Sequence, residues 1–276
     1  RERGVRGAAD HRPRPAVRTF NSRRAERLLD KRLVAALRVT STKAGVSLFT
    51  GLLSGFVATL HRLSGQEDIV VGIPTSGQLA HDVPGLVGHC VNLLPLRIAA
   101  HTATRFDALM DECSTAVLDA FDHQALTYGA LLGQLSLERD PSRLPLVSVA
   151  FNVDPDVASS AQAFTTLDVV QDTIPRRYEN FEMFVNLRPL DGGLQVEAQY
   201  NTDLFDEVSV QRWLDMFQCV LQSASHKPDE TIGRLEVLSS AAAHALLALQ
   251  PARVPLIGAP LAHAAFLTRA AGADNI

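Results

Sequence analysis

The spacing of apolar residues along the chain predicts several amphipathic helices. After Ser47, apolar side chains recur every three or four positions as far as Gly65, which is the repeat of one helix face. Serine commonly precedes the first turn of a helix and glycine commonly ends one, so both boundaries agree with the repeat. The same reasoning predicts helices over residues 30–44, 47–65, 105–122, 128–135 and 206–221.

Other segments have the pattern of β-strands. The run IVVGI at 69–73 is apolar on both faces, as in a strand buried inside a sheet. Residues 194–200 alternate apolar and polar side chains, and the turn sequence DGG at 191–193 joins them to a similar alternation at 181–187, so a hairpin is expected. Further strands are expected at 90–98 and 146–153. Strands that alternate with helices, together with one hairpin, predict an α/β (α+β type) sandwich whose mixed, partly antiparallel sheet packs against helices.

Both ends of the chain have the composition of linkers. Residues 1–24 contain eight arginines and two acidic residues, and such blocks of like charge are usually solvated. The alternative is an arm that packs on a missing domain. From about Ala241 the sequence is alanine-rich with three prolines that prevent a long helix, so we expect poor order beyond about residue 245. The predicted divisions are 1–18 as a linker from a missing N-terminal lobe, 19–240 as the folded lobe and 241–276 as a linker toward a following domain.

The composition narrows the function classes. Hydrophobic residues make up 46% of the chain and charged residues 20%, and the formal net charge is −4, so neither a nucleic acid nor a membrane is expected as partner. No apolar run reaches the roughly 18 residues of a membrane-spanning helix. The three cysteines include no CxxC pair, which argues against a disulfide framework and favours a reducing cytosol as the compartment.

The sequence also lacks the common catalytic motifs. It contains no GxGxxG, GxxxxGK[ST], GxSxG or HExxH, which argues against the usual nucleotide sites, serine-hydrolase elbows and zinc proteases. The nearest group of metal-type side chains is His81, His89, Cys90 and His101. Their spacing fits neither a helix face nor a CxxC pair, so no metal site is predicted.

Three short motifs, in this order along the chain, resemble those of the condensation domain of nonribosomal peptide synthetases. The segment GHCVNLLPLR at 88–97 resembles GxFVNTxxxR, the pair HQ at 123–124 resembles the start of HQDxPFE, and RDPSRLPL at 139–146 resembles RDxSRNPL. The stretches LHRLSGQEDIVVGIP at 60–74 and YNTDLFD at 200–206 are also similar to that family. Each motif is short, but their order and spacing together are specific.

The resemblance covers roughly residues 10–240 and implies both a fold and an activity. Condensation domains resemble chloramphenicol acetyltransferase: two similar lobes enclose a tunnel, where carrier domains present an acyl or peptidyl donor and an aminoacyl acceptor as phosphopantetheine thioesters for amide formation. The family's HHxxxDG motif, whose second histidine assists the reaction, is absent from this sequence. The resemblance therefore implies a C-terminal lobe that is inactive alone and binds no cofactor directly. Its implied partners are carrier domains, a missing N-terminal lobe and a following adenylation domain.

Two other functions stay open. An epimerisation or heterocyclisation domain has the same fold and differs mainly in the motif region absent here, whereas a carrier-docking or scaffold fragment would not be enzymatic. Three departures from the family motifs bear on the substrate: His89-Cys90 stands where aromatic residues are usual, ALTYG follows His123-Gln124, and Leu144 replaces an asparagine. We also expect the lobe face left uncovered by the missing half to be apolar.

The motif match assigns candidate residues, none of them catalytic. His89, Asn92 and Arg97 are the candidates for a wall of the tunnel or for the lobe junction. The alternatives are that Arg97 only pairs with an acidic side chain at that junction, that Asn92 only binds backbone, and that His89 is packed. The residues expected to be structural are His123, Arg139, Asp140 and Arg143. The last three are expected to form an ion-pair cluster that fixes a turn.

Overall fold

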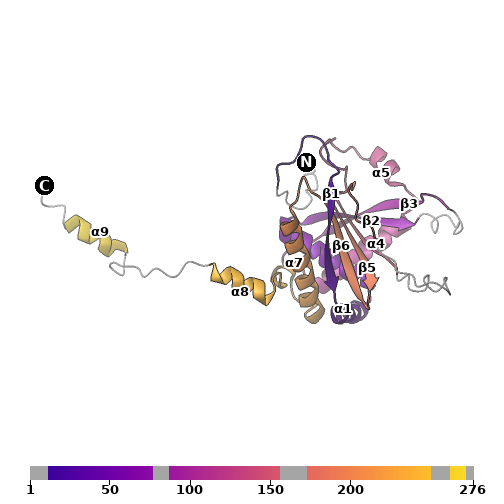
Figure 1. The fold of residues 1–276 in the computed structure, drawn as a ribbon. Helices are drawn as coiled ribbons and strands as arrows, with labels where there is room; N and C mark the ends of the chain where they lie inside the picture. The colour runs from indigo at the N-terminus through magenta and orange to yellow at the C-terminus, as the bar shows by residue number, and fades with distance from the viewer. Residues whose placement is uncertain (1–11, 77–86, 156–172, 250–261, 272–276) are drawn as a thin grey trace. The chain divides into compact units, whose positions relative to one another are not determined.

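The computed structural model describes residues 12–76, 87–155, 173–249 and 262–271 (Figure 1). The chain divides into two compact units, Arg1–Val237 and Leu238–Ile276. The first unit contains a sheet with its helices, and the second contains two short helices.

Six strands form one mixed sheet in the first unit. They are β1 (Ser22–Leu29), β2 (Asp68–Ser76), β3 (Val91–Ala99), β4 (Val149–Val153), β5 (Met183–Leu190) and β6 (Gly193–Asn201). Their order across the sheet is β1-β6-β5-β4-β2-β3. The pairs β2–β4 and β4–β5 are parallel and the other three pairs are antiparallel. The predicted mixed, partly antiparallel sheet is therefore confirmed.

The helices follow the apolar repeats closely. They are α1 (Lys31–Lys43), α2 (Leu48–Ser64), α4 (Phe106–Asp122), α5 (Tyr128–Gln134), α7 (Glu207–His226) and the short 3-10 helix η1 (Ile232–Arg234). The side chains of Asp30, Ser47 and Asp206 accept hydrogen bonds from backbone N–H groups in the first turns of α1, α2 and α7, as their positions in the sequence predict. Among the described helices, none is by itself long and apolar enough to cross a membrane, although α1 and α2 meet the criteria of length and composition together, across a bend of 103°.

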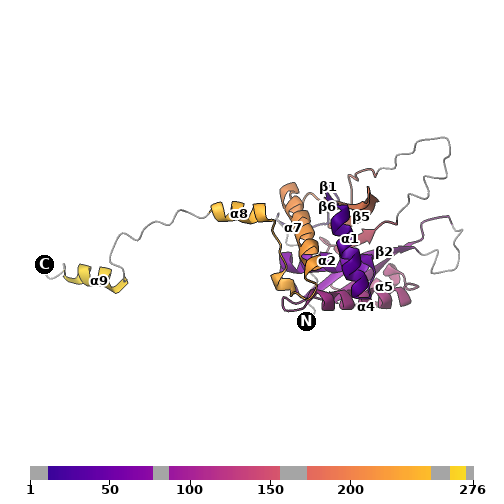
Figure 2. The ribbon, with the colours of Figure 1, turned by 90° about the horizontal axis from the view of Figure 1, so that it is seen from below.

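Helix α2 lies at the centre of the core. Every residue from Thr50 to His61 is buried. Phe56 stacks on Phe151 of β4, with ring centroids 5.1 Å apart, and meets Phe217 of α7 edge-on at 6.0 Å. Helices α1, α2 and α7 pack together on one face of the sheet (Figure 2). The buried residues of β6 on that face are Leu194, Val196, Ala198 and Tyr200.

The predicted hairpin of β5 and β6 turns at Asp191 and Gly192. Both residues have positive φ, 50° and 79°, which is the backbone of a type I′ turn and matches the twist of the paired strands. A Cβ atom on the following residue, Gly193, would overlap the carbonyl oxygen of Leu29. The end of β1 therefore lies close against this turn.

Among the strands of the sheet, β1 is the one that the sequence pattern does not predict. It begins inside the arginine-rich block, whose composition indicates a solvated linker, yet all eight of its residues pair with β6. Only Ala25 and Leu29 of this strand are buried as apolar residues. The strand lies at the edge of the sheet, where charged side chains are common, so its alternation is hidden among arginines.

The second unit contains α8 (Ser240–Ala248) and α9 (Ala262–Ala271). The Ser239 side chain accepts a hydrogen bond from Ala242 N at the start of α8. Both helices lie in or reach into the segment that the composition predicts to be poorly ordered. Residues 1–11 of the first predicted linker and 250–261 and 272–276 of the second lie outside the described residues.

Candidate functional site

The asparagine of the first motif ties β3 to the segment before α5. Asn92 Nδ2 donates hydrogen bonds to the carbonyl oxygens of Gln124 and Leu126, each at 3.0 Å. Its Oδ1 accepts from the backbone N–H groups of Leu93 at 2.9 Å and Tyr128 at 3.0 Å. These four bonds use the full capacity of the amide, so Asn92 binds backbone in this structure.

The second motif lies beside the first. His123 ends α4 with an exposed side chain, and its carbonyl oxygen accepts from Leu126 N at 3.0 Å. The next residue, Gln124, accepts a hydrogen bond at Oε1 from Thr75 Oγ1 of β2 at 3.5 Å. The structure thus brings the HQ pair and Asn92 together at the turn between α4 and α5, where the His123 side chain is exposed.

Arg97 points to the other face of β3. It lies five positions after Asn92, and alternate residues of a strand face opposite sides, so the two side chains share no wall. Arg97 Nε and Nη2 donate to Asp68 Oδ1 and Oδ2 at 2.9 and 2.8 Å, with the side chains 76% and 53% exposed. The hydrogen bond from Arg97 lowers the pKa of the Asp68 carboxyl.

The remaining residue of the first motif, His89, is exposed, and Cys90 beside it is half-buried. The packed alternative for His89 is therefore not what the structure shows. His101 is exposed and its Nδ1 lies 3.3 Å from Glu67 Oε1, while His81 lies outside the described residues. Within the described residues, no three side chains of the His, Cys, Asp or Glu type gather as a metal ion would require.

The third motif forms a turn. Asp140 Oδ1 accepts from Ser142 N at 2.8 Å and Ser142 Oγ at 2.5 Å, and these bonds lower the pKa of its carboxyl. Arg143 Nε lies 3.5 Å from Asp140 Oδ2. Arg139 is exposed. The structure thus brings Asp140 and Arg143 together but places Arg139 outside the described ion pair.

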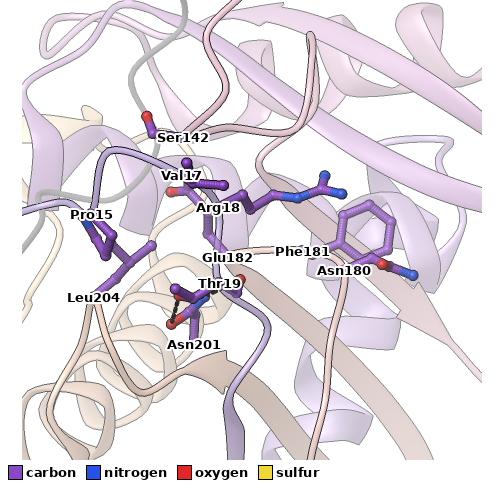
Figure 3. A pocket seen from close by; sticks show the side chains of 10 residues that line it. All are labelled: Pro15, Val17, Arg18, Thr19, Ser142, Asn180, Phe181, Glu182, Asn201 and Leu204. Atoms are coloured by element: carbon purple, nitrogen blue, oxygen red, sulfur yellow. Dashed lines mark hydrogen bonds between the residues drawn. The ribbon is translucent and has the colours of Figure 1, made fainter.

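The same turn reaches a buried carboxylate at the start of β5. Glu182 is 4% exposed and accepts from Arg14 Nη1 and Nη2 at 2.8 and 3.1 Å, and from Arg143 Nη1 at 3.5 Å. Arg14 Nη1 also donates to the carbonyl oxygen of Ser142 at 3.2 Å. Beside these groups, a small pocket opens between the segment before β1, the turn and the start of β5 (Figure 3). Its polar wall includes Glu182 and Asn201, both buried.

A second buried carboxylate lies on the sheet face opposite α2. Glu197 of β6 accepts from Arg188 Nε at 2.9 Å and from Thr173 Oγ1 at 2.5 Å, and Arg24 Nη1 lies 3.4 Å away. We call this side of the sheet the polar face; on β6 it carries Gln195, Glu197, Gln199 and Asn201. On β6 this face is polar and hydrogen-bonded, whereas the register places Ala150 of β4 and Phe184 of β5 on the same side.

The polar face continues onto β4 and β5. Asn152 Nδ2 donates to Asp154 Oδ1 and to Asn186 Oδ1, each at 2.8 Å. Asn186 Nδ2 donates to Asp154 Oδ2 at 2.8 Å, which closes a triangle of half-buried polar side chains. By the strand register, Arg97 lies on this same side of the sheet. This face can therefore offer amide and carboxylate groups to a bound molecule.

Comparison with known proteins identifies the family. The family model "Condensation domain" matches residues 8–247 of this chain. The chain belongs to the condensation domain family. Surfactin synthase subunit 1 of Bacillus subtilis (strain 168) is 30% identical to it over 244 residues, which are 88% of this chain and 7% of that protein.

Solved structures show the same condensation-domain fold. A four-domain nonribosomal peptide synthetase bound to AMP and glycine superposes with a TM-score of 0.77 at 20% identity, over 86% of this chain and 19% of that one. The X-domain from teicoplanin biosynthesis superposes with a TM-score of 0.75 at 20% identity, over 85% of this chain and 54% of that one. The chain thus spans a small part of the synthetases it resembles and about half of the X-domain chain.

The site residues predicted from the sequence do not include the buried charged side chains Arg14, Glu182 and Glu197 of this condensation-domain chain. Arg14 lies in a block whose composition indicates solvent exposure. Glu182 and Glu197 lie in segments predicted to be strands from their apolar positions. The alternation of Val196 and Ala198 around Glu197 does indicate the face on which Glu197 lies. It does not indicate that the face is covered, because Arg24, unlike the nearby partner Arg188, is remote from Glu197 in the sequence.

Proposed function

We propose that this chain is the C-terminal lobe of a nonribosomal peptide synthetase condensation domain, and that the complete domain joins two carrier-bound substrates by an amide bond. The observation that carries the proposal is the match of the condensation-domain model to residues 8–247. Its sequence relatives are peptide synthetases such as surfactin synthase. The X-domain chain, of which this chain covers 54%, supports a second lobe outside the sequence.

In the proposed reaction, the amine of the acceptor attacks the carbonyl carbon of the donor thioester. A C–N bond forms, the C–S bond breaks, and the amine loses a proton while the phosphopantetheine thiol leaves as the protonated product. Tethered reactants gain from being held in line, and the developing negative charge on oxygen needs hydrogen-bond donors. Because the sequence contains no HHxxxDG motif, we propose that the N-terminal lobe supplies the assisting histidine.

The polar face is our candidate for the tunnel wall of this lobe. Its half-buried triangle, Asn152, Asp154 and Asn186, offers groups that could bind the amides of a tethered substrate. Arg97 lies on the same face, where it could line the tunnel or meet the other lobe. Asn92 lies on the opposite side of β3, and its hydrogen bonds hold the turn after α4 in place.

The partners follow from the proposed reaction. The phosphopantetheine arms belong to donor and acceptor carrier domains, so this lobe binds no cofactor of its own. An adenylation domain that loads the acceptor carrier is the proposed neighbour beyond the tail. An epimerisation or heterocyclisation domain is the alternative within the same fold, and the sequence of the N-terminal lobe would distinguish it.

A non-catalytic docking role is the second candidate. The observation that favours it is a solved complex of the X-domain with OxyB from teicoplanin biosynthesis, whose X-domain has the fold of this chain with a TM-score of 0.73. A lobe of this kind could hold a partner protein without forming an amide. Activity measurements separate the two candidates.

The test is a condensation assay with loaded donor and acceptor carrier domains. This chain alone is compared with a polypeptide that also contains the N-terminal lobe. We expect no amide from the chain alone, because one wall neither aligns the thioester and the amine nor excludes water, and amide formation when both lobes are present.

Two results would contradict the proposal. Turnover by the chain alone, above the background of the carriers, would reveal a catalytic group within it, and His89→Ala and His123→Ala would then be the first variants to compare. No amide from the two-lobed polypeptide, combined with retained binding of a carrier or another protein, would favour the docking role.

A further inference from the structure

Residues 12–21, which we call the strap, run over the loops of the first unit before β1 begins. Their path is fixed by hydrogen bonds to the turn of the third motif, to the loop before β5 and to the loop after β6. Apart from those of Arg14, these bonds join Arg12 Nη1 to Thr202 O at 2.6 Å, Arg18 N to Pro141 O at 2.9 Å, Asn201 Nδ2 to Thr19 O at 2.8 Å, Glu179 N to Phe20 O at 3.0 Å and Asn21 Nδ2 to Asp203 Oδ2 at 3.0 Å.

The buried anchor of the strap is the pair formed by Arg14 and Glu182. The side chains are only 13% and 5% exposed, and the guanidinium donates two hydrogen bonds to the carboxylate. A planar guanidinium fits a carboxylate in one orientation, so this pair fixes the direction of the strap as well as its position. Removing one partner would leave the other charge buried without its principal counter-charge.

The third motif provides the other side of the anchor. Asp140 shapes the turn that presents the carbonyl oxygen of Ser142 to Arg14 and the guanidinium of Arg143 to Glu182. The motif therefore does more than close its own turn, since it joins the strap to the first residues of β5. Four side chains, at positions 14, 140, 143 and 182, thus form one connected junction.

We propose that Arg14 and Glu182 are positioning residues, which set where the N-terminal lobe sits on this lobe. The inference rests on the proposed function: an upstream lobe is joined to this one through the strap. If the strap tilts, that lobe shifts, and the assisting histidine moves relative to the wall of this lobe. Reactions between tethered groups are sensitive to such shifts, because a misplacement of about 1 Å can cost about 100-fold in rate.

The test uses the two-lobed polypeptide with Arg14→Lys or Glu182→Gln. Lysine keeps the charge without the two-pronged contact, and glutamine keeps the shape without the charge. We expect kcat for amide formation to fall by about 10- to 100-fold with KM for each carrier within about twofold, since the alignment changes and the carrier-binding surfaces do not. The matched control is Arg105→Lys, which breaks an exposed two-pronged contact to Asp107 in the first turn of α4 and should leave kcat unchanged.

Two further measurements separate positioning from a general loss of folding or of activity. In the same variants, hydrogen exchange at the amides of Arg18 and Ser22 should accelerate at least tenfold, while amides within β6 keep their protection. Spin labels at exposed Val39 of α1 and on the N-terminal lobe should report a broader distance distribution than in the wild type. This measurement needs no turnover, so it remains decisive even if the two-lobed wild type forms no amide and the proposed function fails.

Unchanged exchange at both amides, or an unchanged distance distribution, would overturn the inference. A loosened strap combined with wild-type kcat would overturn it as well, because placement by the anchor would then have no consequence for the reaction. Equal losses in Arg105→Lys would also count against it, since they would show that any such contact matters.

Discussion

At the scale of the residue, Asn92 and Arg97 show how one short motif can contain two unrelated roles. Asn92 is partly buried, and its amide makes four hydrogen bonds to backbone groups. Arg97 pairs with Asp68 on an exposed face, where ion pairs contribute about 0–1 kcal/mol to stability. The free energy of folding should therefore depend on Asn92 much more than on Arg97.

The variant Asn92→Asp tests this difference. Aspartate keeps the acceptor for Leu93 and Tyr128 but loses both N–H donors and sets a negative charge against two carbonyl oxygens. We expect the free energy of unfolding, measured with urea, to fall by about 1–3 kcal/mol, the usual cost of leaving partly buried groups unsatisfied. The control is Asn180→Asp at an exposed side chain, and a loss at Asn180 equal to that at Asn92 would contradict the assignment.

At the scale of the element, the β5–β6 hairpin and β1 depend on each other. The turn needs positive φ at Asp191 and Gly192, and the next residue must leave room for the end of β1. Gly192 is thus required by backbone conformation and Gly193 by close approach. Two adjacent glycines serve two separate physical demands.

Alanine substitution should separate these demands. The Cβ of Gly192→Ala would make only an ordinary contact with Lys31 but would sit on a strained φ, so we expect a loss of about 1 kcal/mol in the free energy of unfolding. Gly193→Ala meets the carbonyl oxygen of Leu29 and should cost about 1–3 kcal/mol or more, with faster hydrogen exchange in β1. The control is Gly133→Ala in α5, where a Cβ meets nothing, and it should not destabilise the protein. A larger loss for Gly192→Ala than for Gly193→Ala would refute the contact with β1.

The elements that the sequence predicts are those with a strong local period. The sequence predicts the helix caps and the hairpin turn because the residues that form each of them lie within a few positions of one another. The caps are Asp30, Ser47 and Asp206. The sequence does not predict the junction of Arg14 and Glu182, since these partners are 168 residues apart. Asn92 is intermediate: the motif singles it out, but its bond to Tyr128 N, 36 residues away, becomes apparent only in the fold.

At the scale of the whole first unit, the two faces of the sheet differ in their chemistry. One face packs on α1, α2 and α7 and supplies the apolar core. The other face carries paired carboxylates and amides, which cost free energy to bury unless their hydrogen bonds are satisfied. In the reaction proposed above, such a polar face would suit the wall of a tunnel, because that wall would bind polar thioester and amide groups as well as exclude water.

The boundary of the first unit makes a last prediction. Helix α8 buries none of its residues, whereas Ile232 and Leu235 are 0% and 2% exposed and their carbonyl oxygens accept hydrogen bonds from Arg62 Nη1 at 2.9 and 3.3 Å. Ending the chain after Ser239 should therefore change the free energy of unfolding by less than about 0.5 kcal/mol. Ending it after Lys227 removes two buried side chains and should cost at least about 2–5 kcal/mol. Urea denaturation of both truncated chains is the measurement, and a loss after Ser239 as large as that after Lys227 would show that the tail is part of the folded lobe.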